Sequence, residues 1–164
     1  MSTVTAQEIA VQDDPLALEQ QVCFALAVTN RAVLAVYRPL LEPLGLTHPQ
    51  YLVMLALWDH GKLAQSPLSV KQIATALQLD SATLSPMLKR LESLGLISRT
   101  RSAADERSTA VALTAEGAAL RERALDIPPT VVARLGVDLA ELVELHRVLS
   151  RVNTAALAAG ALDS

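Results

Sequence analysis

The chain contains little cysteine and few aromatic residues. Its 164 residues include one Cys, one Trp, two Tyr and one Phe. A single cysteine cannot form an internal disulfide, which fits a reducing compartment. The aromatic side chains all fall between residues 24 and 58. The core elsewhere must therefore consist of Leu, Val, Ala and Ile, a composition that favours packing between helices.

The sequence also lacks the features of membrane and secreted proteins. No uninterrupted apolar run approaches the ~18 residues that a membrane-spanning helix needs. Residues 1–14 have neither the basic start nor the apolar run of a signal peptide. There are no repeats, and the length suits one domain, residues 1–164. We therefore expect a cytoplasmic, single-domain protein with no membrane partner.

Charge is unevenly distributed along the chain. The net charge is −3, yet residues 62–107 hold seven basic and four acidic residues, a local charge of +3 that leaves −6 for the remainder. A basic middle in an acidic frame can provide a face for phosphates. A solvated charged surface has the same composition, so charge alone does not identify the partner.

Helical patterns account for the first part of the chain. Asp14 and Pro15 form a typical helix start, and apolar residues then recur at helical spacing until Pro39 bends or ends the pattern. A second helix begins at Pro49 and ends near Gly61.

The last part of the chain is also helical. Thr114 caps a further helix, the pair Pro128–Pro129 breaks the pattern, and residues 138–157 predict a long final helix. Nothing within the chain covers the apolar stripes at both ends. We therefore expect residues 12–46 and 115–160 to supply the dimerisation helices of a homodimer.

The middle of the chain, residues 62–113, predicts a winged helix-turn-helix. Two short helices are followed by two strand-like segments that a polar, charged tip joins. In such a motif the second helix enters the major groove of DNA and the tip reaches the backbone or minor groove. The predicted fold class is mainly α, a winged helix-turn-helix with N- and C-terminal dimerisation helices. The expected ranges are 68–77 and 81–94 for the helices, 96–100 and 108–113 for the strands, and 101–107 for the tip.

The second of these helices has two different sides. Its buried side is expected to carry Leu84, Met87, Leu88, Leu91 and Leu94. The opposite side is small and polar near its start, which lets a helix approach base edges. That side carries Ala82, Ser85, Pro86, Lys89 and Ser93, with Arg90 at its edge. Pro86 either kinks the helix or moves its start beyond Ser81.

Two stretches carry a family resemblance. "VYRPLLEPLGLTHPQYLVMLALW", residues 36–58, and "LDSATLSPMLKRLESLGLISRTRSAADERS", residues 79–108, closely resemble the MarR family of transcriptional regulators, and more narrowly its organic-hydroperoxide-sensing repressors. The resemblance covers about residues 16–128. It implies binding to double-stranded operator DNA, with Arg107 of the wing in the minor groove and Asp105 holding that arginine in place.

The DNA-binding residues expected from the helix and the wing form one set. Those on the helix offer small or polar groups to base edges, and the basic ones lie where phosphates would run. The set is Ser81, Ala82, Thr83, Ser85, Lys89, Arg90, Arg99, Arg101 and Arg107.

Cys23 is open to two interpretations. Free cysteines are mostly small buried hydrophobes, and here no charged residue lies closer than Glu19. A helix that starts at Pro15 places Cys23 about two turns inside, beyond the strong part of the helix dipole. A reactive thiol would therefore need activation from elsewhere in the fold or from another subunit.

The resemblance favours the reactive thiol. In the resembling repressors a cysteine near the start of the first helix senses peroxide, and hydroxyls of two tyrosines from the opposite subunit hold its thiolate. Cys23 and Tyr37 match the cysteine and the first tyrosine. The second tyrosine is replaced, since the family's "TYPQY" is "THPQY" here, with His48 in its place. His48 stabilises the thiolate, or it caps the helix at Pro49 while Tyr51 or water substitutes.

The resemblance implies a repressor that releases its operator when an organic hydroperoxide oxidises Cys23. A small thiol then forms a mixed disulfide, or further oxidation follows. The alternative is a MarR-type repressor released by a small phenolic or aromatic ligand, with Cys23 structural. A thiol peroxidase is disfavoured, because no arginine or threonine flanks the cysteine and no second cysteine recycles it. The sequence predicts no enzyme, metal or cofactor.

Overall fold

The computed structural model describes residues 15–63, 67–101 and 108–161. The chain divides into two compact units, residues 1–35 and 36–164. The helices and strands of the described ranges are α1 (Val22–Leu41), α2 (His48–Leu63), β1 (Leu68–Ser69), α3 (Val70–Leu77), α4 (Ser81–Ser93), β2 (Ile97–Arg101), β3 (Thr109–Leu113), α5 (Ala115–Ala124), α6 (Ile127–Leu135) and α7 (Leu139–Ala158).

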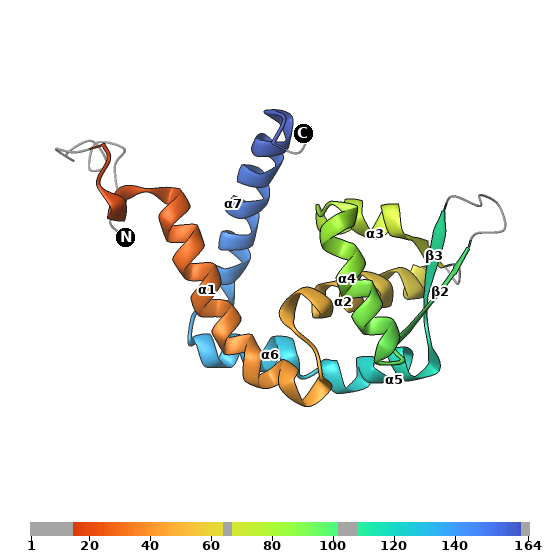
Figure 1. Ribbon diagram of the computed structural model, residues 1–164. Coiled ribbons are helices and arrows are strands. Elements are labelled where there is room, and N and C mark those ends of the chain that lie inside the picture. The colour runs from red at the N-terminus through yellow and green to blue at the C-terminus, as the bar shows by residue number, and fades with distance from the viewer. Residues whose placement is uncertain (1–14, 64–66, 102–107, 162–164) are drawn as a thin grey trace. The chain divides into compact units, whose positions relative to one another are not determined.

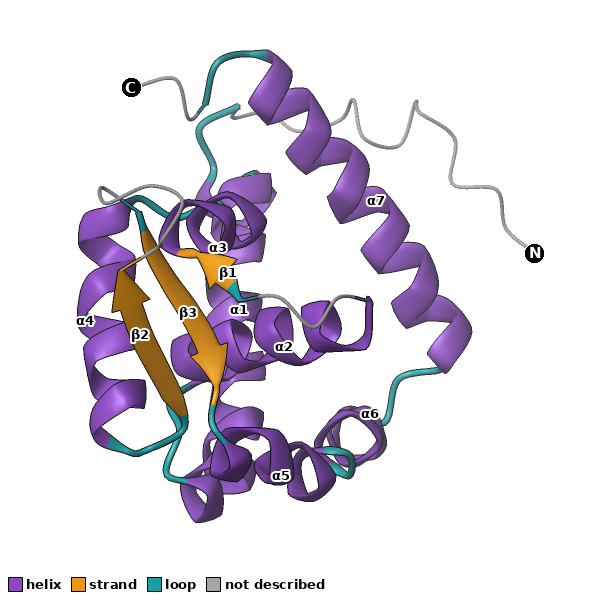
Figure 2. Cartoon of the chain, turned by 90° about the vertical axis from the view of Figure 1, so that its right-hand side faces the viewer, coloured by secondary structure: helices purple, strands orange, loops and turns teal. Residues whose placement is uncertain are grey.

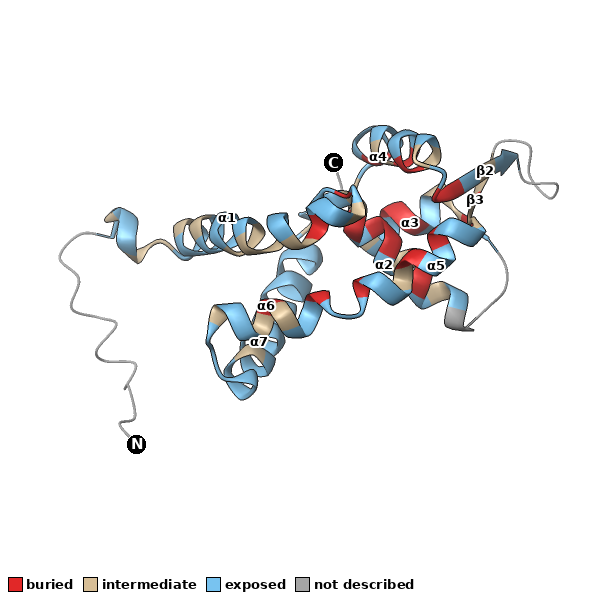
Figure 3. Cartoon of the chain, turned by 90° about the horizontal axis from the view of Figure 1, so that it is seen from below, coloured by how far each residue is buried: buried red, intermediate tan, exposed pale blue. Residues whose placement is uncertain are grey.

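The core of the second unit lies among α2, α3, α4, α5 and the strands. Its most deeply buried side chains are aliphatic, as the composition predicted, and they come from several elements (Figure 3). Two aromatic side chains join them, Tyr51 and Trp58 of α2, which are 3% and 5% exposed. The fully buried aliphatic side chains include Val53, Met54, Ile73, Leu84, Leu91 and Val111.

A three-stranded antiparallel sheet stands beside the helix-turn-helix (Figure 2). The predicted hairpin is present, with β2 paired to β3 from Ile97 opposite Leu113 to Arg101 opposite Thr109. Its tip, residues 102–107, lies outside the described residues. The sequence did not predict β1. Leu68 and Ser69 were assigned to the start of a helix, but they pair with Val111 and Ala110 of β3.

Helix α3 begins directly after β1 because Ser69, the last residue of β1, is also the N-cap of α3. The Ser69 hydroxyl accepts a bond from the Gln72 N–H, and the Gln72 side chain accepts one from the Ser69 N–H, which completes a capping box. The cap fixes the start of the first helix of the motif at the edge of the sheet.

Helix α4 is continuous through Pro86. Asp80 is its N-cap, so the helix starts at Ser81 and the later start is excluded. Because proline has no N–H, the carbonyl of Ala82 receives no bond from residue 86. At the other end Gly95 adopts a φ of 73°, and the Leu96 N–H bonds the Leu91 carbonyl, as in a glycine-terminated helix.

The first helix differs from its prediction at both ends. A 3-10 turn spans Leu18–Gln20, and α1 begins at Val22 rather than at Pro15. Pro39 lies inside α1, which ends at Leu41. By length and composition the segment Val22–Leu44 could cross a membrane. The criterion of an uninterrupted apolar run does not detect this segment, because Asn30 and Arg31 interrupt it.

The end of the chain contains a helix that the sequence did not predict. Pro128 and Pro129 were interpreted as a break, but they form the first turn of α6, where proline's fixed φ suits a helix and its missing N–H costs nothing. Gly136 ends α6 with a φ of 63°. Helix α7 follows, as predicted, with Asp138 as its N-cap.

Helix α7 buries none of its residues (Figure 3). Its exposed apolar side chains are Leu139, Val143, Leu145, Leu149, Val152 and Leu157. In proteins most helical stability comes from packing an apolar face. Within the chain itself, α7 lacks that contribution.

Helix α5 packs tightly against the start of β2. The Thr114 hydroxyl caps α5 by accepting from the Gly117 N–H, as the sequence predicted for Thr114. A Cβ on Gly117 would lie 1.9 Å from the carbonyl oxygen of Leu96. Only glycine permits this approach of helix to strand.

Gly117→Ala is expected to destabilise the protein by about 2 kcal/mol or more, because the backbone of Leu96 must move away from the new methyl group. Urea unfolding followed by circular dichroism measures the change. Gly61→Ala is the matched control, since its Cβ would meet nothing within 4 Å and α2 should gain about 0.5–1 kcal/mol. Equal effects of the two substitutions would contradict the assignment of a close contact at Gly117.

Candidate nucleic-acid interface and thiol site

The outer face of α4 is polar and open, and its inner face is closed. Leu84, Leu88 and Leu91 are at most 1% exposed, so three successive turns anchor the helix to the core. Met87 and Leu94 pack partly against the same core. Every residue of α4 that was predicted to contact DNA is exposed, namely Ser81, Ala82, Thr83, Ser85, Lys89 and Arg90.

Asp80 holds the first turn of α4 in place. Its Oδ1 accepts a 2.6 Å hydrogen bond from the Thr83 N–H. This backbone bond is the main cause that lowers the pKa of the Asp80 carboxyl below its ordinary value. The capped turn presents Ser81 and Ala82 in a defined orientation, as a helix inserted into a groove requires.

Arg99 is engaged within the protein. Its Nη2 lies 2.6 Å and its Nε 3.0 Å from Oε2 of Glu92. The arginine's hydrogen bond is the main cause that lowers the pKa of Glu92. The pair joins the last turn of α4 to β2, so Arg99 supports the hairpin, and its contact with a DNA phosphate stays a prediction. Arg101 is exposed at the end of β2.

Sequence reasoning missed Glu92 as the partner of Arg99. A signal for it was present, because the two residues stand on either side of the chain reversal at Gly95, where antiparallel segments bring such residues together. The wing residues Asp105 and Arg107 lie outside the described residues, and their predicted roles stay predictions.

Cys23 is exposed. It is the second residue of α1, not a residue two turns inside a helix, because α1 starts at Val22. A position in the first turn lies at the positive end of the helix dipole, which favours negative charge. Its neighbours are apolar and accessible: Val22 is 69% and Leu26 is 40% exposed.

The structure brings Tyr37 and His48 together. Their ring centroids lie 4.9 Å apart with the planes at 71°, an edge-to-face contact. The ring of Tyr51 lies 6.1 Å from Tyr37 and 6.2 Å from His48, and Trp58 follows at 6.5 Å from Tyr51. We call these residues, Tyr37, His48, Tyr51 and Trp58, the aromatic cluster.

Burial divides the aromatic cluster. Tyr37 and His48 are partly exposed, while Tyr51 is 3% exposed and belongs to the core. Burial lowers the pKa of His48 and raises that of Tyr37. Burial, and secondarily the charge of Tyr37, raises the pKa of Tyr51. At neutral pH the accessible pair is therefore a neutral phenol and a neutral imidazole, both able to donate one hydrogen bond.

The start of α2 is capped without His48. The Gln50 side chain accepts a 3.0 Å bond from the Thr47 N–H, and the Tyr51 N–H bonds the Thr47 carbonyl. The sequence left open whether His48 caps this helix; in the structure Thr47 and Gln50 form the cap. The imidazole is available for contact with Tyr37.

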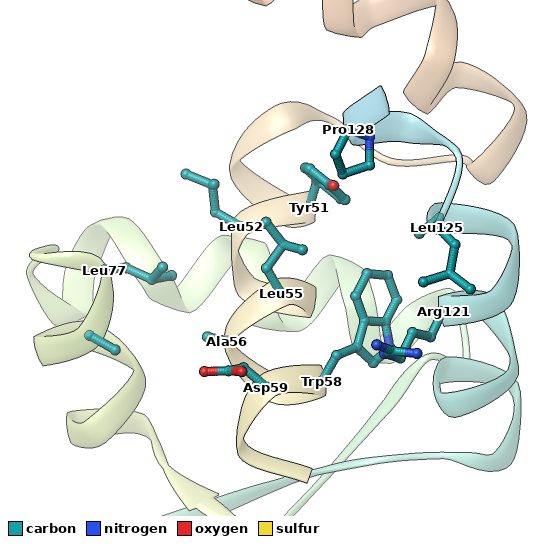
Figure 4. Close-up of a pocket in the computed structure, with 12 residues that line it drawn as sticks. Tyr51, Leu52, Leu55, Ala56, Trp58, Asp59, Leu77, Arg121, Leu125 and Pro128 are labelled. Atoms are coloured by element: carbon teal, nitrogen blue, oxygen red, sulfur yellow. The ribbon is translucent and has the colours of Figure 1, made fainter. Parts of the chain in front are cut away.

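A pocket of about 560 Å³ opens between α2, α3, α5 and the start of α6. Figure 4 shows Leu55, Leu125 and Pro128 around an apolar space, with the ring of Tyr51 on one side and the guanidinium of Arg121 on the other. Among the residues that the structure describes, no group of three His, Cys, Asp or Glu residues could hold a metal ion.

The comparisons with known proteins agree with this geometry. A family model described as "Transcriptional regulator SarA/Rot" matches residues 35–123. The chain is 47% identical over 132 residues to the organic hydroperoxide resistance transcriptional regulator of Bacillus subtilis (strain 168), covering 79% of this chain and 86% of that protein. It is 43% identical over 130 residues to the HTH-type transcriptional regulator TtmR of Methylorubrum extorquens (strain PA1), covering 79% of this chain and 64% of that relative's length.

A similar solved structure is that of reduced AbfR bound to DNA, a protein of Staphylococcus epidermidis. Its TM-score is 0.70 at 31% identity, and the match covers 84% of this chain and 91% of that one. A relative with this fold therefore binds DNA.

Lys89→Ala is expected to weaken binding to all DNA sequences and to reduce the slope of log K against log salt by about 0.9, because one phosphate contact is lost. Fluorescence anisotropy with a labelled duplex at several salt concentrations measures both quantities. Arg99→Ala is the comparison. Since Arg99 is paired with Glu92, its removal should change the slope less than removal of Lys89 does, and equal slope changes in the two variants would refute this difference.

Stability should depend on the pH through His48. Because burial lowers its pKa, the unfolded chain takes up the proton first as the pH falls below the ordinary value of 6.5. Stability is therefore full above that pH and declines below it. His48→Tyr should show a smaller loss of Tm between pH 7.5 and 5.5 than the wild type does. His146→Tyr, at an exposed position in α7, controls for removal of a histidine, and an equal loss in wild type and His48→Tyr would contradict the prediction.

Proposed function

The chain belongs to the MarR family of transcriptional regulators, in its organic hydroperoxide resistance branch, and we propose that it is a homodimeric repressor that releases its operator when an organic hydroperoxide oxidises Cys23. The observation that carries the proposal is the exposed position of this single cysteine in the first turn of α1. As a transcriptional regulator, the protein binds DNA and is not an enzyme.

DNA recognition is assigned to α4 and to the β2–β3 hairpin. The polar outer face of α4 enters the major groove, where Ser81, Ala82, Thr83 and Ser85 approach base edges. The basic side chains contact phosphates, namely Lys89, Arg90, Arg99 and Arg101. In the same proposal Arg107 of the wing enters the minor groove, and Asp105 holds that arginine in place.

The proposed dimer would bury apolar residues that the terminal helices expose in the single chain. Helix α7 buries no residue, and α1 buries only Leu41. Helices of 20 residues with exposed leucines and valines gain stability from a partner surface. A second copy of the chain supplies that surface, and it also supplies the two recognition helices that a two-fold symmetric operator requires.

The chemistry begins with the thiolate of Cys23. Its sulfur attacks the terminal oxygen of the hydroperoxide, the O–O bond breaks and an S–O bond forms. The leaving alkoxide takes up a proton, so the products are a sulfenic acid and an alcohol, with the sulfur oxidised by two electrons. The exposed Val22 and Leu26 give an organic tail an apolar surface to contact, which favours organic hydroperoxides over hydrogen peroxide.

The donors proposed for the thiolate are Tyr37 and His48 of the opposite subunit. Their edge-to-face contact at 4.9 Å holds two partly exposed donors side by side. Neutral side chains suit this role, since the hydroxyl and the imidazole N–H stabilise an anion by donating hydrogen bonds to it. Oxidation removes the anion and weakens these bonds between the subunits.

The chain has no second cysteine to resolve the sulfenic acid. We propose that a small cellular thiol attacks the sulfenic sulfur, forming a mixed disulfide and releasing water. The proposed partner is DNA, and the proposed reactant is a small thiol of a reducing compartment. We therefore propose that the protein acts in the cytoplasm.

The pocket beside Arg121 supports the alternative, release by a small aromatic or phenolic ligand. A mostly apolar space of about 560 Å³, with Arg121 and Asp59 as the charged residues of its lining, suits a small aromatic or phenolic ligand. In that case Cys23 would be structural. The two proposals differ in their dependence on the thiol.

The test is a gel shift of the protein on its upstream DNA, titrated with cumene hydroperoxide and repeated with Cys23→Ser. The peroxide should raise the Kd of the wild type for DNA at least tenfold. It should leave the Kd of Cys23→Ser unchanged, because this variant lacks the nucleophile. Salicylate serves as the ligand probe in both proteins. Release of wild type and Cys23→Ser alike by salicylate, with no effect of the peroxide on either, would favour the alternative and overturn the sensor proposal.

A further inference from the structure

Trp58 makes a buried contact that neither DNA binding nor the thiol chemistry requires. Its indole Nε1–H donates a 2.9 Å hydrogen bond to the carbonyl oxygen of Gly117, 59 residues further along the chain. The side chain is 5% exposed, so water does not replace this bond readily. The bond fixes α2 to the first turn of α5.

The first turn of α5 is also bound to the end of α4 and the start of β2. The Thr114 hydroxyl, which caps α5, donates a 2.6 Å bond to the carbonyl of Gly95. The Thr114 N–H donates to the carbonyl of Leu96 at 3.1 Å. Gly95 and Leu96 connect α4 to β2, and Ile97, the next residue, begins the hairpin.

This junction leaves little room for independent movement. The absence of a side chain at Gly117 lets α5 lie directly on the Leu96 carbonyl, where a methyl group would come within 1.9 Å. A displacement of the first turn of α5 is therefore passed to the backbone between α4 and β2. We call the residues Trp58, Gly95, Leu96, Thr114 and Gly117 the α5 junction.

The α5 junction is continuous with the aromatic cluster. Trp58 belongs to both, and its ring packs edge-to-face against Tyr51 at 6.5 Å. Tyr51 in turn lies about equally far from Tyr37 and His48. An unbroken series of packed rings and hydrogen bonds thus leads from the two accessible donors to the elements assigned to DNA.

We propose that the α5 junction transmits the change at Tyr37 and His48 to α4 and the hairpin, with Trp58 and Thr114 as positioning residues. When the bonds to the Cys23 thiolate are lost, the rings of the aromatic cluster shift. Trp58 then displaces the first turn of α5, and that turn displaces the end of α4 and the start of the hairpin. This inference rests on the proposed sensor function.

The first measurement uses Trp58 itself, because it is the protein's one tryptophan. Its fluorescence emission is recorded for the full-length protein before and after stoichiometric oxidation with cumene hydroperoxide. The emission maximum or intensity should change in the wild type and stay constant in Cys23→Ser. Unchanged emission in wild type that has released its DNA would overturn the proposal.

The second measurement compares Trp58→Phe with the wild type. Phenylalanine keeps a ring against Tyr51 but cannot donate to Gly117. The rate of thiol loss with cumene hydroperoxide should stay within about twofold of the wild type. The ratio of the Kd for DNA after oxidation to that before should fall at least about fivefold, the lower end of typical coupling between sites.

Thr114 provides an independent pair of variants. Thr114→Val removes the bond to Gly95 and should reduce the same ratio, whereas Thr114→Ser keeps a hydroxyl and should restore it. A wild-type ratio in both Trp58→Phe and Thr114→Val would overturn the α5 junction alone. If oxidised wild type keeps its DNA affinity, the sensor function itself fails. Should either substitution prevent folding by circular dichroism, the fluorescence of the wild type decides.

Discussion

The burial of one side of α4 is the constraint on which the rest of the structure depends. Leu84, Leu88 and Leu91 enter the core over three turns, so the helix can neither rotate about its axis nor detach without exposing apolar surface. The polar, exposed outer face is thereby fixed in direction. Figure 1 shows α4 leading from α3 to the β2–β3 hairpin. An anchored recognition helix gives defined contacts to DNA. Control of binding must therefore move α4 together with its supports or change the spacing between two copies of it.

The division between anchored and exposed parts suits such control. The core of the second unit is tightly packed, whereas α7 exposes most of its leucines and valines, and α1 exposes Val22 and Leu26 near its start. The proposed subunit interface is thus built from helices whose stability depends on the partner. A change of hydrogen bonding at one cysteine can shift that interface at a small cost, while the DNA-binding elements stay folded. In the proposed transmission, the α5 junction, which includes Gly117 and Thr114, links the aromatic cluster to the DNA-binding elements.

His48 shows how this chain departs from the pattern it resembles. An imidazole stands where the related repressors have a phenol, and it packs edge-to-face on Tyr37. Burial lowers its pKa, so it serves at neutral pH as an uncharged donor, much as a tyrosine would. In the proposed site the histidine would keep an uncharged donor, and the lowered pKa of His48 predicts a dependence of stability on acidic pH.

The sequence by itself determined the helix-turn-helix, the hairpin and both sides of α4, because each follows from local periodicity, caps and turn residues. It also singled out Cys23, Tyr37 and His48, but only through a resemblance. Tertiary structure decided what local patterns do not contain: the pairing of β1 with β3 and the contact of Trp58 with Gly117. These depend on backbone approach between segments distant in the chain. The distance between such segments is set by the packing of the whole core, so a short stretch of sequence does not predict it.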